Sequence, residues 1–292
     1  MTHFEGKVAI VGGNLGKVKG GKFTKGLGAL IAERIASHGG KVVVTDLDAA
    51  VVQACAEALG VKGIHVDLLK DRTGHEITVD HPYRKNPDGT PKKITDVEWD
   101  DSPAHELVKQ VIEEYGRVDV LVNNWDWFDK STIEKTSSEQ FDEIHRRNVA
   151  PVFHMIAAVR NQFANQHQAD PNSWGKVVNV FSFVGKAGMS MASVFSAFKG
   201  SMIGLTKGLA REFGRFAIVN SVAYGPIKTQ GPPARQRNIT AYFSTSTDYG
   251  QKNALTPDLV ANVVEFMASD ASNGMCGQTV SVDMGLWLKL EQ

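Results

Sequence analysis

A serine, a phenylalanine and a lysine stand at a spacing that gathers side chains at one site. Ser182 ends an apolar run, Phe195 follows 13 residues later, and Lys199 follows four residues after that. Residues four apart share one face of a helix, so Phe195 and Lys199 are expected to meet. A phenyl ring has no proton to exchange. The middle position of this set therefore lacks the group that acid–base chemistry needs.

A glycine-rich turn follows the first apolar run. Gly13 (or Gly12) opens this turn, and Gly26 and Gly28 close it before a helical stretch. Such a turn lets the backbone approach a diphosphate, which then lies at the helix N-terminus. Asp46 ends the next apolar run, where a carboxylate can accept a hydrogen bond from an adenosine ribose. The pattern predicts a dinucleotide-binding unit that favours NAD over NADP.

Short apolar runs alternate with longer stretches of helical period along the whole chain. Runs that are apolar without alternation are typical of strands buried on both faces of a parallel sheet. Strand–helix alternation predicts an α/β fold with one doubly wound sheet, and residues 1–292 are expected to form one domain. The predicted strands cover Val8–Val11, Val42–Val44, Val118–Val122, Val177–Val180 and Ala217–Val222.

Three segments interrupt this plan. Residues 14–25 are expected to be a loop rich in glycine and lysine. Residues 70–101 place Pro-Asp-Gly-Thr between two β-rich stretches, which predicts a hairpin or extended arm. Residues 225–256 are expected to form a loop region near the substrate, before a helix that begins near Pro257.

These motifs together resemble the short-chain dehydrogenase/reductase family over nearly the whole chain outside the three interruptions. The resemblance implies a Rossmann-type, mostly parallel seven-stranded sheet with helices on both faces. It places Asn148, Ser182, Phe195 and Lys199 at the family's catalytic positions. It also implies a cofactor-binding set, which comprises Gly13, Gly26, Gly28, Asp46, Asp67, Leu68 and Asn123.

The resemblance implies a role for each catalytic position. In an active member a tyrosine hydroxyl exchanges the alcohol proton while nicotinamide carries the hydride. The lysine lowers the pKa of that tyrosine and binds ribose, the serine orients the substrate oxygen, and the asparagine supports a proton relay. Phe195 stands at the tyrosine position, so only residual activity is expected. Tyr224 and Tyr242 are the candidates for a substitute proton donor.

Other positions depart from the family pattern as well. The family's Asn-Asn-Ala-Gly reads Asn-Asn-Trp125-Asp126, which adds bulk and negative charge beside the expected cofactor. The family's Pro-Gly after the sixth strand reads Tyr224-Gly225, and the glycine turn is stretched by about nine residues. Several linked departures indicate drift in an unused site, so this chain is expected to be inactive and to bind no cofactor.

The helices that build family dimers and tetramers remain amphipathic, at about 138–168 and 193–213. An intact assembly surface beside an altered site suggests a pseudoenzyme paired with an active, NAD-dependent paralogue. The expected assembly is a hetero-oligomer, a tetramer by family precedent, and the expected substrate is a hydroxyacyl-CoA. The four lysines in 14–25 offer one way to hold a phosphate-bearing ligand such as coenzyme A.

Two alternatives stay open at this point. The first is an active NAD-dependent dehydrogenase, either a divergent one or a Tyr→Phe mutant. The second is a regulatory protein that binds a ligand in the Rossmann pocket without turning it over.

Composition excludes several other classes. Lys+Arg and Asp+Glu are 32 each, so no net charge favours nucleic acid or a membrane surface. Cys55 and Cys276 form no CxxC pair, and the histidines, including His75 and His81, show no metal-ligand spacing. The first residues lack the features of a leader peptide, and no apolar run reaches membrane-spanning length. A cytoplasmic protein without a metal is expected.

Overall fold

Seven parallel strands form the central sheet of the computed structural model, which describes residues 3–70, 73–99, 102–227 and 255–286. The strand order is β11-β10-β9-β8-β1-β4-β5, with the crossover at β1 and β8 that makes the sheet doubly wound. The predicted fold class is therefore confirmed. The strands are β1 (Val8–Gly12), β4 (Lys41–Thr45), β5 (Lys62–Gly63), β8 (Val120–Asn123), β9 (Gly175–Ser182), β10 (Ala217–Tyr224) and β11 (Thr279–Val282).

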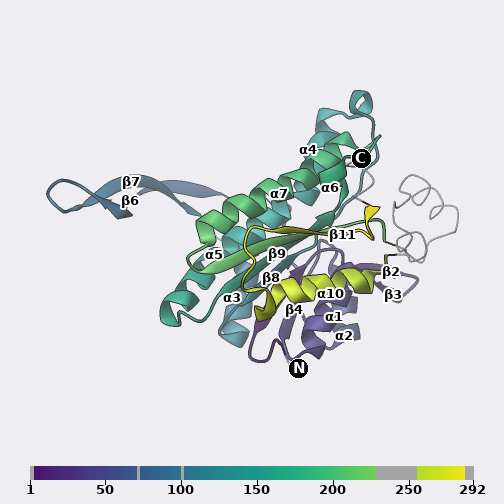
Figure 1. Ribbon diagram of the computed structural model, residues 1–292, viewed down its shortest axis with the longest axis horizontal. Helices are drawn as coiled ribbons and strands as arrows, with labels where there is room; N and C mark the ends of the chain where they lie inside the picture. The colour runs from purple at the N-terminus through teal and green to yellow at the C-terminus, as the bar shows by residue number, and fades with distance from the viewer. Residues whose placement is uncertain (1–2, 71–72, 100–101, 228–254, 287–292) are drawn as a thin grey trace.

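Helices cover both faces of the sheet (Figure 1). Strand β1 explains the continuous apolar runs: Ala9 and Val11 enter one buried cluster, whereas Val8 and Ile10 enter the other. Successive side chains of a strand point to opposite faces, so both sets must be apolar. One face carries α1 (Leu27–Ser37), α2 (Ala49–Leu59) and α10 (Pro257–Ala268); the other carries α3 (Pro103–Tyr115), α5 (Ala150–Ala169) and α7 (Ser193–Phe213).

The expected helix over 138–168 is two helices. Helix α4 (Ser138–Asn148) ends where α5 begins, and Val149 separates them. Pro151 lies in the first turn of α5, where its missing N–H costs nothing, but it cannot continue a helix from before. Asn148 therefore ends a helix and does not lie within a long one. The shorter elements are α6 (Val184–Ala187), η1 (Ile133–Lys135) and η2 (Asp270–Ser272).

Segment 14–25 is a small hairpin and not the expected loop. Strands β2 (Gly16–Lys19) and β3 (Lys22–Lys25) pair in antiparallel fashion. Gly20 and Gly21 connect them with φ values of 57° and 73°, a left-handed pair that suits a two-residue hairpin turn. The glycine pair between two alternating stretches was the sequence signal for this hairpin.

The hairpin predicted within 70–101 is confirmed. Strands β6 (Gly74–Lys85) and β7 (Pro91–Trp99) pair only with each other in the described structure, and they project from the body as an arm (Figure 1). Helix α10 begins at Pro257 as expected. Most of the expected loop region at 225–256, including Tyr242, lies outside the described residues.

The approach of the glycine turn to α1 gives a first test. A Cβ on Gly28 would lie 2.3 Å from the Gly13 carbonyl oxygen, a backbone atom that cannot rotate away. We expect Gly28→Ala to lower the free energy of unfolding in urea by about 1–3 kcal/mol. Gly208→Ala in α7 is the matched control, because nothing lies within 4 Å of its added methyl group. Gly208→Ala should leave the free energy of unfolding unchanged or raise it by up to about 1 kcal/mol. Equal losses of stability in the two variants would contradict the close contact at Gly28.

Candidate functional site

The predicted catalytic positions come together where the strands end. Ser182 ends β9 and stands opposite Tyr224, the last residue of β10. Phe195 and Lys199 occupy the first two turns of α7, and both are buried. The Ser182 hydroxyl has no hydrogen-bond partner within the part of the chain that the structure describes. Phe195 and Lys199 are in contact, as their spacing predicts, whereas Ser182 joins this edge of the sheet through its pairing with Tyr224.

Phe195 keeps the tyrosine position apolar. Its ring is 2% exposed, and the Lys199 Nζ atom lies 5.3 Å from the ring centroid. The ring of Phe128 meets it edge-on at a centroid distance of 5.2 Å. The position therefore supplies a cation–π contact and aromatic packing, and it supplies no exchangeable proton.

The Lys199 ammonium is held by the protein itself. Its Nζ donates to the Trp125 carbonyl oxygen at 2.5 Å and forms an ion pair with Asp126 Oδ1 at 3.0 Å. Burial lowers the pKa of this ammonium, and the negative charge of Asp126 acts in the opposite direction. Trp125 and Asp126, which both depart from the family pattern, thus bind the lysine that the resemblance assigned to ribose.

Tyr224 completes this arrangement, which we call the Asp126 triad (Asp126, Lys199 and Tyr224). The Tyr224 hydroxyl donates to Asp126 Oδ2. Burial, together with the charge of Asp126, raises the pKa of Tyr224 well above its usual value. A phenol held in this way stays protonated and bound to a carboxylate, which makes Tyr224 a poor substitute for the missing proton donor.

Trp125 covers the glycine turn. Its indole is 4% exposed and packs against the backbone that opens the turn. A Cβ on Gly12 would lie 2.7 Å from Trp125 Cζ2, and one on Gly13 would lie 2.8 Å from Trp125 Cδ2. Because Gly12 and Gly13 have no side chains, they leave a space that could hold a diphosphate. In this chain the Trp125 indole fills that space. The bulk expected from Trp125 is therefore confirmed, and it lies on the turn itself.

Asp46 is also engaged within the chain. Its Oδ2 accepts from the Leu15 amide at 3.0 Å, and its Oδ1 accepts from the Leu47 amide at 2.7 Å. Burial raises the pKa of Asp46, while these backbone donors act to lower it. Leu15 belongs to the stretched turn, so the insertion supplies a donor at the place that the sequence assigned to a ribose hydroxyl.

The amide groups at the start of α1 have partners from the same insertion. Gly26 N donates to the Leu15 carbonyl at 2.8 Å, and Gly28 N donates to the Asn14 carbonyl at 2.9 Å. A bound phosphate would seek amides at this helix start. The predicted turn is therefore present with Gly13, Gly26 and Gly28 in place, but two of its amides are already satisfied.

The remaining predicted residues serve the fold in this structure. Asn148 exchanges hydrogen bonds with the Trp127 backbone, both at 2.9 Å, and also donates to the Ile144 carbonyl. Asn123 donates to Asn179 Oδ1 at 3.1 Å between β8 and β9. Asp67 accepts from the Leu69 amide, and the buried Leu68 meets His154 through its carbonyl.

A sealed polar rim lies beneath the indole. Among the described residues, four buried atoms here have no hydrogen-bond partner: Thr45 Oγ1, Asn123 Oδ1, Asn124 Oδ1 and Trp125 Nε1. Thr45 and Asn123 flank Gly12 on the two strands that neighbour β1. Buried polar atoms of this kind ordinarily bind ordered water or a ligand. Unpaired polar atoms thus lie close to the glycine turn that the Trp125 indole covers.

These contacts test the fit of a nicotinamide dinucleotide, and as arranged the residues do not accommodate one. Trp125 covers the glycine turn, and the Asp46 carboxylate already accepts from the Leu15 amide. Lys199 is paired with Asp126, which also adds a negative charge to the site. In the described residues no group of three or more His, Cys, Asp or Glu side chains is placed to hold a metal. No described helix is long and apolar enough to cross a membrane.

The ion pair gives a test in the free energy of unfolding. Asp126→Asn keeps the side-chain shape but leaves the buried Lys199 ammonium without a counter-charge, which should cost about 3–5 kcal/mol in urea. Adding Lys199→Met should cost less than the sum of the two single changes, because the second change removes the orphaned charge. Glu114→Gln breaks the exposed pair with Lys62 and serves as the control with no measurable loss. A change below about 0.5 kcal/mol for Asp126→Asn would contradict the buried pair.

Comparison with known proteins agrees with the motifs and the sheet. The family model described as enoyl-(acyl carrier protein) reductase matches residues 93–287, two thirds of the chain. The 3-oxoacyl-[acyl-carrier-protein] reductase of Escherichia coli is 26% identical over 287 residues, which cover 98% of this chain and 99% of the relative. The Thermotoga maritima reductase of that name is 33% identical over 185 residues, 62% of this chain and 71% of the relative.

Solved structures show the same fold. The structure of 3-ketoacyl-(acyl-carrier-protein) reductase from Brucella melitensis complexed with NADH has a TM-score of 0.74 at 22% identity, and covers 97% of this chain and 98% of that one. A short-chain dehydrogenase/reductase structure from Burkholderia xenovorans also has a TM-score of 0.74, at 24% identity, with 98% of each chain covered. The chain belongs to the short-chain dehydrogenase/reductase family of oxidoreductases.

Proposed function

We propose that this chain is a catalytically silent short-chain dehydrogenase/reductase subunit that assembles with an active, NAD-dependent relative. The observation that carries the proposal is the state of Lys199: its ammonium is bound to Asp126 and the Trp125 carbonyl while Phe195 occupies the tyrosine position. Acid–base catalysis of this kind contributes about 10²–10⁴ in rate, and here neither the proton donor nor its activating lysine is available.

The residues predicted to bind the cofactor support the same proposal. The indole of Trp125 covers Gly12 and Gly13, and Asp46 accepts from Leu15. A silent subunit needs the fold and the assembly surface of its family but not the nucleotide. Conversion of the site into core packing then favours stability over binding.

Exposed aromatic side chains support an assembly surface on the flank formed by α4, α5 and α7. Phe141 is 47% exposed on α4 and Phe153 is 48% exposed on α5. Beside Phe153 lies a hollow of about 440 Å³, which His145 and Leu205 also line. Exposed apolar side chains around a hollow are typical of a protein–protein contact. We assign this flank to the active relative, in a hetero-oligomer such as a tetramer.

The names of the relatives support one substrate class. Several of them are named 3-oxoacyl-[acyl-carrier-protein] reductase, so we propose a hydroxyacyl thioester, a hydroxyacyl-CoA, as the substrate of the active subunit. The arrangement resembles the two-subunit 2-[hydroxy(phenyl)methyl]succinyl-CoA dehydrogenase of anaerobic toluene degradation, in which one chain is a pseudo-subunit. The exposed Lys17, Lys19 and Lys22 on the β2–β3 hairpin are candidates to contact the phosphates of such a thioester.

The first experiment is a calorimetric titration with NADH, with acetoacetyl-CoA as an assay substrate. We expect the wild-type chain to bind NADH more weakly than about 1 mM, and Trp125→Ala with Asp126→Gly to bind at least about tenfold more tightly, because the turn is opened and the charge removed. Trp127→Ala is the matched control, since Trp127 is partly exposed and lies outside the glycine turn. Micromolar NADH binding with turnover by the wild-type chain would overturn the proposal in favour of an active dehydrogenase.

Adding the missing hydroxyl separates the rival interpretations further. Phe195→Tyr alone should give no gain in turnover, because Lys199 stays paired with Asp126. Phe195→Tyr combined with Trp125→Ala and Asp126→Gly should give measurable turnover. A gain of about 10²-fold or more from Phe195→Tyr alone would indicate a mutant of an active enzyme. Tight binding of NADH without turnover in either form would favour a regulatory ligand-binding protein.

The assembly surface has its own test. Phe153→Asp places a charge in the proposed contact and should abolish association with the active relative in light-scattering measurements of purified complexes. Phe266→Asp on α10 is the control, because Phe266 is similarly exposed on the opposite face of the sheet. The proposal requires a captured partner that carries the family's serine, tyrosine and lysine and that loses NADH-dependent activity with Phe153→Asp. A partner unrelated to this family would contradict it.

A further inference from the structure

The hairpin arm, strands β6 and β7, projects from the body, and among the described residues no other element packs along it (Figure 1). Ile77 and Val79 lie on one face of β6. Ile94 stands opposite Val79 on β7, and Asp96 stands opposite Ile77. The three apolar side chains are only partly buried by their neighbours within the arm. The opposite face carries polar residues, including the ion pair of Asp80 and Lys93 at 2.5 Å. Because a two-stranded ribbon is marginally stable in water by itself, an amphipathic arm of this kind calls for a packing partner.

The tip of the arm is ordered and basic. The Asn86 amide donates to the Thr90 carbonyl at 2.8 Å, and Asp88 accepts from both the amide and the hydroxyl of Thr90. Residues 84–92 carry three basic side chains against the single Asp88, a net charge of +2. Lys85 and Lys92 are exposed on either side of this turn. The tip thus offers a preformed, positively charged projection.

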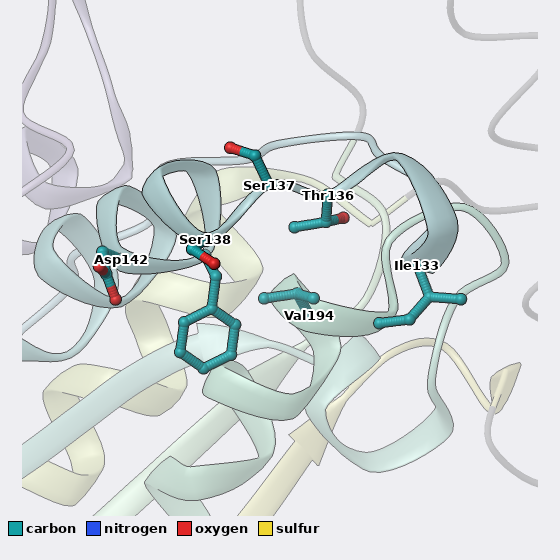
Figure 2. Close-up of a pocket in the computed structure, with 7 residues that line it drawn as sticks. Ile133, Thr136, Ser137, Ser138, Asp142 and Val194 are labelled. Carbon is teal, nitrogen blue, oxygen red and sulfur yellow. The ribbon is translucent and has the colours of Figure 1, made fainter.

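A complementary pocket exists elsewhere on the chain, which we call the η1–α4 pocket (Figure 2). It has a volume of about 340 Å³ and lies between η1, the start of α4 and the start of α7. Ile133, Phe141 and Val194 provide apolar walls, and Ser137 and Asp142 provide polar ones. Ile133 and Phe141 are 67% and 47% exposed, so the pocket presents large apolar side chains to solvent.

The charge around this pocket is opposite to that of the arm tip. Residues 129–142 carry four acidic side chains and two basic ones, a net charge of −2. This count leaves out Glu143, which is paired with Arg146 and Arg147. Glu134 is exposed beside the pocket and Asp142 lines it. The net charges of +2 on the tip and −2 around the pocket favour their contact.

The arm and the pocket lie at different ends of the same chain. Figure 1 shows the arm extending to the far left of the view, whereas α4 lies at the upper right. The arm therefore points away from the pocket of its own chain. Twelve residues of β6 at about 3.3 Å per residue reach roughly 40 Å, enough to cross much of a neighbouring molecule. Contact between the two features requires a second molecule.

We propose that the arm of one copy of this chain docks its basic tip in the η1–α4 pocket of a second copy, and that the exchange is reciprocal. The apolar face with Ile77, Val79 and Ile94 then packs along the neighbour, and the tip meets Glu134 and Asp142. Each copy contributes the same two surfaces, so a two-fold pair satisfies both arms and closes. This pairing is independent of cofactor binding. It uses Phe141 of α4, and it leaves Phe153 and the hollow beside it open to the active relative.

A charge swap between two variants of the full-length chain tests the proposal. Sedimentation velocity should show the wild-type chain with twice its mass of 31.8 kDa. Lys85→Glu with Lys92→Glu reverses the tip from +2 to −2, and Glu134→Lys with Asp142→Lys reverses the pocket from −2 to +2. We expect each double variant alone to raise the dimer dissociation constant by about tenfold or more, because like charges then face each other.

An equimolar mixture of the two variants should restore the dimer, since every tip then meets a pocket of opposite charge. Lys41→Glu, at the start of β4, is the control and should leave the dissociation constant unchanged. Increasing ionic strength should weaken the wild-type dimer. A monomeric wild-type chain at 100 µM, on the order of the concentrations at which weak specific pairs form, would overturn the proposal. So would a mixture that stays dissociated.

Discussion

A buried ammonium requires a counter-charge, and this requirement organises the altered site. Lys199 lies beneath the ends of β8 and β10, where water does not reach it. In this chain Asp126 provides the charge, and Tyr224 and the Trp125 carbonyl complete the hydrogen bonding. Phe195 then needs no polar partner, and its ring faces the lysine ammonium. The residues that depart from the family pattern thus stabilise one buried charge together, which is why they occur together.

The same edge of the sheet combines tight packing with buried polar groups. A nucleotide site combines absent side chains, which leave room, with polar groups, which face the ligand. Here the room above Gly12 and Gly13 is filled by one indole, while the polar groups of Thr45, Asn123 and Asn124 remain below it. Filling a space takes one large residue, whereas replacing each polar group would require several compensating changes in the strands.

The sequence identified the fold well, because the fold depends on local patterns. Apolar runs marked the strands, the Pro-Asp-Gly-Thr turn marked the arm, and the four-residue spacing of Phe195 and Lys199 placed their side chains in contact. Two expectations were wrong for local reasons: Pro151 divides the helix expected over 138–168, and Gly20–Gly21 makes a hairpin of the expected loop.

Partners within the site were less accessible to sequence reasoning. Asp126 was expected to repel a diphosphate, but its pairing with Lys199 joins residues 73 positions apart, which no local pattern shows. Asp46 was assigned to a ribose from its place after a strand. In the structure its carboxylate accepts from the Leu47 amide and from the Leu15 amide, and Leu15 lies in the stretched turn, whose contacts no local pattern shows. Side-chain identity limits the chemistry of a position, and tertiary contacts decide which partner it takes.

The bond between Asp46 and the Leu15 amide has a consequence for how the molecule folds. It lies wholly within the first β–α–β unit and joins residues 31 positions apart. The Asp46 carboxylate therefore takes its backbone hydrogen bonds from residues close in sequence, and these bonds do not depend on β9, α7 or β10. Contacts between residues close in sequence close short loops and cost little chain entropy. This part of the sheet edge can thus form its own hydrogen bonds before the distant strands are added.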